Sequence, residues 1–174
     1  MTEFSHITDD RARMVDISGK GEVYREATAS GRIVLRRETL AAIRDGAVVK
    51  GNVLATARVA ATLAVKGTPA LIPLCHPIPV SSIDVDFEQR EDSLVATVRV
   101  RSLGRTGVEM EALTGVAVAL LTVWDMVKSA EKDSGGQYPV TAITDIRVLE
   151  KRKSELTRGG VTGADSHHSG DRAL

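Results

Sequence analysis

A cysteine and a histidine stand side by side in the segment PLCHPIPV, residues 73–80, together with three prolines. Proline fixes its own φ and disfavours a helical conformation of the residue before it, so this segment is predicted to be a stiff, extended loop. Cys75 and His76 are too few to bind zinc, because a structural zinc site needs about four ligands. We therefore expect no metal site here. A histidine that contacts phosphate or transfers a proton is one interpretation, and a structural histidine is the other.

A second candidate is Lys50, followed by Gly51 and Asn52 at the start of a predicted helix. An amine beside the free N–H groups of a helix N-terminus can bind an anion. Taken alone, the same pattern is more often a surface lysine in a loop.

A third candidate is the pair Asp125 and Lys128, near the end of a long apolar segment. Residues three apart share one face of a helix and can form an ion pair. Such pairs are often weak surface contacts. Here the apolar helix and Trp124 favour partial burial, which would make the pair a candidate acid/base unit.

Glu111 and Asp125 are 14 residues apart on this helix, or about 21 Å along its axis. They cannot both contact one small reacting centre within a single subunit. Either one end of the helix is catalytic, or the site combines helix ends from two subunits. The helix is apolar nearly all round between residues 116 and 123, which favours burial on more than one side. We therefore predict an oligomer with sites between subunits.

The pattern of the whole chain predicts an α+β fold with helices on one face of an antiparallel sheet. Residues 1–153 are expected to form a single domain with an irregular segment at 1–20, and residues 154–174 a disordered tail. The predicted elements are a strand at 22–35, a helix at 38–44, a helix after Asn52 that Gly67 and Pro69 close, a hairpin at 83–100, a helix that begins with a Thr106–Glu109 capping box, and a strand at 142–152.

The composition narrows the class of protein. The 174 residues include 23 Lys+Arg and 23 Asp+Glu, so no overall charge favours nucleic acid or anionic lipid as a partner. Aromatic residues are only 3% of the chain, which argues against a base-stacking surface. The single cysteine suits a reducing compartment. We find neither a signal-peptide pattern nor an apolar run of about 20 residues, and expect a cytoplasmic protein with no membrane partner.

Five segments, taken together, carry a resemblance to a known family. They are MVDISGK (14–20), KGNVLATARVA (50–60), LIPLCHPIPV (71–80), RTGVEMEALTGV (105–116) and WDMVKSAEKD (124–133). In this order they resemble the cyclic pyranopterin monophosphate synthases, the protein C family of molybdenum cofactor biosynthesis.

The resemblance implies a lyase that rearranges 3′,8-cyclo-7,8-dihydro-GTP into cyclic pyranopterin monophosphate and releases pyrophosphate. It implies no obligatory cofactor, and it leaves open a divalent cation bound with the triphosphate. It also implies a ferredoxin-like fold and a homohexamer, a trimer of dimers, with its sites between subunits.

Residue by residue, the resemblance implies that Asp125 is catalytic and that Lys50 and Lys128 transfer protons. The implied substrate-binding positions are Leu74, Cys75, His76, Met110 and Glu111, with Lys151 near the phosphates. The sequence departs from the family after Lys151, which leaves the choice between Lys151 and Lys153 open, and SGGQYPVT lengthens a nearby loop. The alternatives are a non-catalytic nucleotide-binding regulatory module and, less favoured for want of ligands, a metal-binding protein.

Overall fold

The computed structural model describes residues 7–8 and 11–154. Within them the elements are β1 (Ile7–Thr8), β2 (Arg11–Ala12), β3 (Val23–Val34), α1 (Arg37–Arg44), α2 (Val53–Leu71), β4 (Val80–Gln89), β5 (Ser93–Gly104), α3 (Glu109–Glu131) and β6 (Ala142–Ser154). The segment expected to be irregular thus includes the short β1–β2 pair. The tail prediction concerns residues outside the described range, apart from Ser154, which ends β6.

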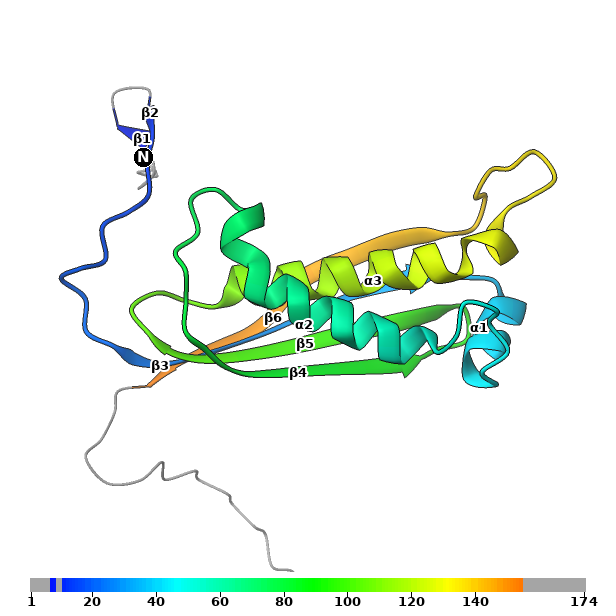
Figure 1. Cartoon of the computed structure of the whole chain (residues 1–174), viewed down its shortest axis with the longest axis horizontal. Coiled ribbons are helices and arrows are strands. Elements are labelled where there is room, and N and C mark those ends of the chain that lie inside the picture. Colours follow the sequence, from blue (N-terminus) through cyan, green and yellow to red (C-terminus); the bar gives the residue numbers. More distant parts are fainter. Residues whose placement is uncertain (1–6, 9–10, 155–174) are drawn as a thin grey trace, which may run out of the picture.

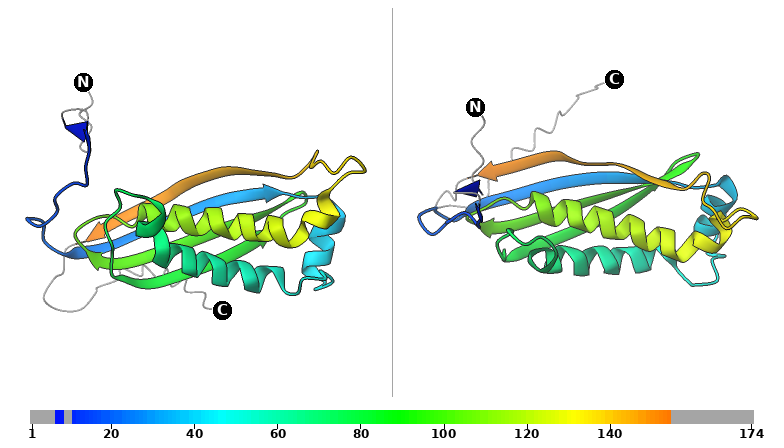
Figure 2. Two further views of the ribbon diagram at one scale, coloured as in Figure 1. Left: turned by 45° about the horizontal axis from the view of Figure 1, so that its top comes forward. Right: turned by 90° about the horizontal axis from the view of Figure 1, so that it is seen from above.

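Four of the described strands form an antiparallel sheet in the order β4-β5-β3-β6. The two long helices, α2 and α3, lie side by side on one face of this sheet (Figures 1 and 2). From β3 onward the chain forms a strand, two helices, two strands, a helix and a strand; apart from the short α1, this is the ferredoxin-like arrangement. The predicted α+β class, with helices on one face, is confirmed.

The core lies between the sheet and the helices. On β5, Leu94, Ala96, Val98 and Val100 are buried at alternate positions, as a strand with one covered face requires. Helix α3, which covers one face of the sheet, contributes buried residues along its whole length. Among the described residues, α3 is also the one helix long and apolar enough to cross a membrane by length and composition. Its packing against β3, β5, β6 and α2 explains that apolar character without a membrane.

Two predicted helix boundaries are wrong. Helix α2 passes Gly67 and Pro69 and ends at Leu71. Pro69 is tolerated because it lies in the last turn, where the missing N–H costs a single bond. Helix α3 begins after Val108, and the described residues provide no side-chain cap at that position. The Glu109 carboxylate instead accepts a hydrogen bond from Lys151 Nζ at 3.1 Å, so a tertiary contact replaces the expected capping box.

Gly31 of β3 is closely packed against α3 and the neighbouring strand β6. A Cβ atom there would be 2.9 Å from side-chain atoms of both Val116 and Ile146. We expect Gly31→Ala to lower the free energy of unfolding by about 1–3 kcal/mol because overpacking forces the core to shift. Gly67→Ala is the matched control: no described atom lies within 4 Å of its added Cβ, and a helical Gly→Ala change should stabilise by up to about 1 kcal/mol. Urea denaturation of both variants checks this. The prediction would be contradicted if the free energy of unfolding changed in the same direction in both.

Candidate active site

Asp125 holds one lysine on each carboxylate oxygen. Lys128 Nζ donates to Asp125 Oδ1 at 2.7 Å, and Lys50 Nζ donates to Oδ2 at 2.9 Å. Lys50 also donates to the main-chain oxygen of Asp125 at 2.7 Å. The structure therefore brings the three predicted catalytic residues together as the Lys50–Asp125–Lys128 cluster.

Local structure explains how these side chains are placed. Asp125 and Lys128 are three residues apart on α3 and share a face, as predicted. Lys50 comes from the loop between α1 and α2, where Gly51 has a φ of +99° that favours glycine. Directly after it, Asn52 caps α2 by accepting the Ala55 N–H at 2.9 Å. From this loop the amine of Lys50 reaches Asp125, to which it donates its hydrogen bonds.

Electrostatics fixes the protonation states within the cluster. Hydrogen bonds from Lys128 and Lys50 lower the pKa of Asp125 to about 2. The Asp125 carboxylate in turn raises the pKa of Lys128. At neutral pH Asp125 is therefore an anion and Lys128 an ammonium group, which can act as a proton donor.

The partial burial expected for this pair is not found in the single chain. The side chains of Asp125 and Lys128 are 58% and 47% exposed. They point away from the core because Met126 and Val127, between them on the helix, are the residues that face it. Solvent screening keeps such a pair from contributing much to stability.

A cavity of about 440 Å³ lies at the opposite end of α3. All five residues of the predicted substrate-binding group that precede β6 line it, namely Leu74, Cys75, His76, Met110 and Glu111. The proline-containing loop supplies the first three and the first turn of α3 the other two. The cavity is also lined by residues that sequence reasoning missed: Val15, Ile17, Lys20, Ile78, Thr106, Gly107 and Glu109.

Glu111 is a buried carboxyl group in the lining of this cavity. It is 2% exposed, and its Oε1 atom has no hydrogen-bond partner among the described residues. Burial, and to a smaller extent the nearby Glu109, raises the pKa of Glu111. Burial also raises the pKa of the Cys75 thiol. Cys75 is therefore a poor nucleophile.

The raised pKa of Glu111 predicts how stability depends on pH. Between the ordinary glutamate value and the raised one, the folded state binds more protons than the unfolded state, so Glu111 makes stability fall as pH rises. Glutamine cannot ionise. We therefore expect Glu111→Gln to become more stable relative to wild type as the pH rises above about 4.5. Urea midpoints of the two proteins from pH 4.5 to 8 measure this, and parallel curves would show the prediction to be wrong.

A smaller, basic hollow of about 170 Å³ adjoins the cavity and shares Gly107 and Glu109 with it. Arg25, Glu26, Lys151, Arg152 and Lys153 also line this hollow, so its cationic side chains outnumber its carboxylates. Arg25 lies opposite Lys153 in the β3–β6 register. Lys151 and Lys153 thus lie on the same hollow, and the cationic side chains suit a phosphate group.

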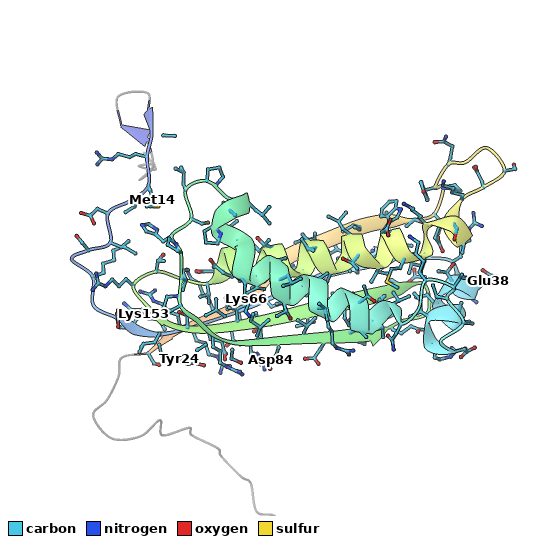
Figure 3. All side chains as sticks on the ribbon, in the orientation of Figure 1. Met14, Tyr24, Glu38, Lys66, Asp84 and Lys153 are labelled. Carbon is cyan, nitrogen blue, oxygen red and sulfur yellow. The ribbon has the colours of Figure 1, made fainter. Side chains whose placement is uncertain are left out.

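The predicted site residues form two groups at opposite ends of the molecule. Figure 3 labels Lys153 and Met14 at one end and Glu38 of α1 at the other. The cavity and the basic hollow belong to the first end, and the Lys50–Asp125–Lys128 cluster to the second. Because α3 is one helix from Glu109 to Glu131, Glu111 and Asp125 on it are about 21 Å apart along its axis, as the sequence predicts. Within one chain these groups do not form a single site.

The missed residues lie in segments whose place depends on tertiary contacts. Lys20 belongs to the segment MVDISGK, and this motif was the only signal that could have nominated it. The segment is joined to the loop before α3 by a hydrogen bond from Arg105 to the Ser18 carbonyl at 3.2 Å. Arg25 is placed at the hollow by the β3–β6 register and by hydrogen bonds that it donates to the Gly104 and Arg105 carbonyls.

The described part of the chain has no group of three or more His, Cys, Asp or Glu side chains that could hold a metal ion.

Comparison with known proteins extends these observations over nearly the whole chain. Residues 14–154 match the MoaC family. The probable cyclic pyranopterin monophosphate synthase of Methanospirillum hungatei is 69% identical over 156 residues, which are 90% of this chain and 100% of that protein. The protein of the same name from Methanoregula boonei is 68% identical over 155 residues, 89% of this chain and 100% of that protein. A probable cyclic pyranopterin monophosphate synthase accessory protein from Methanothermobacter thermautotrophicus is 57% identical over 156 residues, 90% and 98% of the two chains. The chain belongs to the MoaC family.

Proposed function

We propose that this protein is a cyclic pyranopterin monophosphate synthase, a lyase of molybdenum cofactor biosynthesis. It converts 3′,8-cyclo-7,8-dihydro-GTP into cyclic pyranopterin monophosphate and releases pyrophosphate. The names of the relatives support this assignment. The observation that carries it is the Lys50–Asp125–Lys128 cluster, an ionised aspartate with a lysine on each carboxylate oxygen. A regulatory nucleotide-binding module needs a pocket but has no use for such a proton-transfer unit.

The cavity and the adjoining hollow fit the two parts of this substrate. A cavity of about 440 Å³ accommodates a heterocycle of purine size. Glu111 Oε1, which has no partner in residues 7–8 and 11–154, offers an acceptor to ring N–H groups. The basic hollow takes the triphosphate, with Arg25 and Lys151 or Lys153 as its cations. His76, which also lines the cavity, contacts the substrate as well.

The cluster supplies the acid and base of the reaction. Lys128 gives a proton to a ring nitrogen or a leaving oxygen as the purine ring opens, and Lys50 takes part in the proton transfers of ring closure. Asp125 holds both amines in place and stabilises the charged form of Lys128. Displacement at phosphate depends on positioning and charge stabilisation, which the basic hollow provides.

The complete site combines the cavity of one subunit with the cluster of another, within a homohexamer built as a trimer of dimers. The distance between the two groups along α3 supports this arrangement. So do apolar side chains on the outer surfaces of the helices, where Val59, Leu63 and Leu121 are 58–64% exposed in the single chain. We place the enzyme in the cytoplasm, without an obligatory cofactor and without nucleic acid or membrane partners.

The experiment is a turnover assay with purified protein and 3′,8-cyclo-7,8-dihydro-GTP. We expect cyclic pyranopterin monophosphate and pyrophosphate in equal amounts, and neither product from GTP as the control substrate. Binding of the cyclised nucleotide without turnover would contradict the proposal and favour the regulatory module.

A further inference from the structure

We propose that Glu131 is a positioning residue that holds Lys50 against Asp125. The inference rests on the proposed function for its kinetic consequence. The geometric claim stands by itself, because it concerns only how one buried carboxyl group connects the two elements that carry the Lys50–Asp125 contact.

Glu131 is fully buried in the last turn of α3. Its Oε1 accepts the main-chain N–H of Arg36 at 3.1 Å, with Oε2 at 3.4 Å from the same nitrogen. Oε2 also accepts the hydroxyl of Thr141 at 2.6 Å. One side chain thus joins the end of α3, the start of α1 and the residue before β6.

These elements carry both partners of the Lys50–Asp125 contact. Asp125 lies six residues before Glu131 on α3. Arg36 is the N-cap of α1, and the loop after this eight-residue helix contains Lys50. The Arg36–Glu131 hydrogen bond therefore fixes where α1 starts relative to the helix that carries Asp125. Below α1, Leu40 and Ile43 pack into the core, but apolar contacts are less directional than this bond.

An apolar residue at position 131 would leave two donors in the fold without an acceptor, the Arg36 N–H and the Thr141 hydroxyl. Buried polar groups are costly unless they are all satisfied, and a satisfied set specifies one arrangement. A purely structural glutamate would account for this burial too. The two roles differ in what they predict for Lys50, which lies outside the core.

Two substitutions at Arg36 separate the effect of its main-chain hydrogen bond to Glu131 from the effect of its side chain. Arg36 has a φ of −64°, which proline adopts without strain, so Arg36→Pro removes the N–H donor. It also removes the guanidinium, which donates to the Ala130 carbonyl at 3.5 Å. Arg36→Ala removes the guanidinium alone and is the matched control. A second pair of variants changes the acceptor, Glu131. Glu131→Met can accept neither the Arg36 nor the Thr141 hydrogen bond. Glu131→Gln keeps an acceptor for Arg36 and can donate its amide to the Thr141 oxygen.

Two measurements are made on the assembled protein: kcat and KM, and the rate at which an amine-reactive acylating reagent modifies Lys50, followed by mass spectrometry. We expect Arg36→Pro and Glu131→Met to lower kcat by about 10- to 100-fold, since misplacement by about 1 Å has this effect. KM should change by less than about threefold, because the cavity is at the other end of α3. Once Lys50 Nζ is freed from its two hydrogen bonds to Asp125, it should react at least about threefold faster. Arg36→Ala and Glu131→Gln should stay within about twofold of wild type in both measurements.

The proposal is overturned if Arg36→Pro matches Arg36→Ala in both kcat and Lys50 reactivity. It is also overturned if kcat falls, KM rises and the stability of the variant falls with them. The same holds if neither disruptive variant folds, since Glu131 would then serve stability alone. If the wild type shows no turnover, the proposed function fails, but Lys50 acylation still decides whether Glu131 positions the cluster.

Discussion

Asp125→Asn should lower kcat by about 10³- to 10⁴-fold, the upper range for loss of acid/base catalysis. The carboxylate accepts one hydrogen bond from each lysine, at 2.7 and 2.9 Å. An asparagine amide has one acceptor oxygen, and its NH₂ group would face the other ammonium. The substitution therefore removes the negative charge that both lysines contact and breaks one of the two hydrogen bonds.

The pH dependence gives a second expected result for this variant. Because Asp125 raises the pKa of Lys128, its replacement should shift the basic limb of any residual activity to lower pH. Wild-type Asp125, with a pKa of about 2, stays ionised throughout the assay range. Substrate affinity should change little, since the cavity residues are untouched. Asp86→Asn, at an exposed aspartate on β4, is the control. A kcat for Asp125→Asn within tenfold of wild type would contradict a catalytic role.

Lys50→Ala should lower kcat by at least about 100-fold, because it removes one of the two proton-transfer amines. Its effect on stability should stay below about 1 kcal/mol, since Lys50 and Asp125 are both about half exposed. Lys66→Ala is the matched control: Lys66 is an exposed lysine of α2 (Figure 3), outside the cluster, the cavity and the hollow.

Lys50→Arg separates charge from proton transfer. Arginine keeps a positive charge but does not give up its proton at neutral pH. If Lys50 transfers a proton, Lys50→Arg should be nearly as slow as Lys50→Ala in the turnover assay. Recovery to near wild-type kcat would instead assign Lys50 a purely electrostatic role.

The local sequence pattern was sufficient to predict most of the fold. Strand β5 alternates buried and open positions, and α3 follows a sustained apolar pattern, so both could be placed from sequence. The start of α3 could not, because Glu109 binds Lys151 of β6, a partner 42 residues away. Likewise, Pro69 indicated a helix end, but in the last turn of α2 it costs too little to stop the helix.

The candidate site was predictable where spacing along one helix decides the contact. Asp125 and Lys128 follow from i,i+3 geometry, and the separation of Glu111 from Asp125 follows from helix rise. By contrast, the contact of Lys50 with Asp125 spans 75 residues, and local pattern alone favoured a surface lysine. Lys20, Arg25 and Glu131 depend on tertiary contacts and were not nominated.

Glu111→Gln lacks the carboxylate of the cavity, and we expect it to be inactive, as Asp125→Asn is. Mixing these two variants tests most directly whether one subunit's cavity works with another subunit's cluster. Glu111→Gln should retain an intact cluster and Asp125→Asn an intact cavity, so a mixed oligomer can form complete sites. Random mixing of equal amounts across a two-fold interface should restore about a quarter of wild-type turnover. A mixture of Asp125→Asn with Lys50→Ala should stay inactive, because no subunit then has an intact cluster. If native mass spectrometry shows that Glu111→Gln and Asp125→Asn form mixed oligomers, and these remain inactive, the shared-site account is wrong.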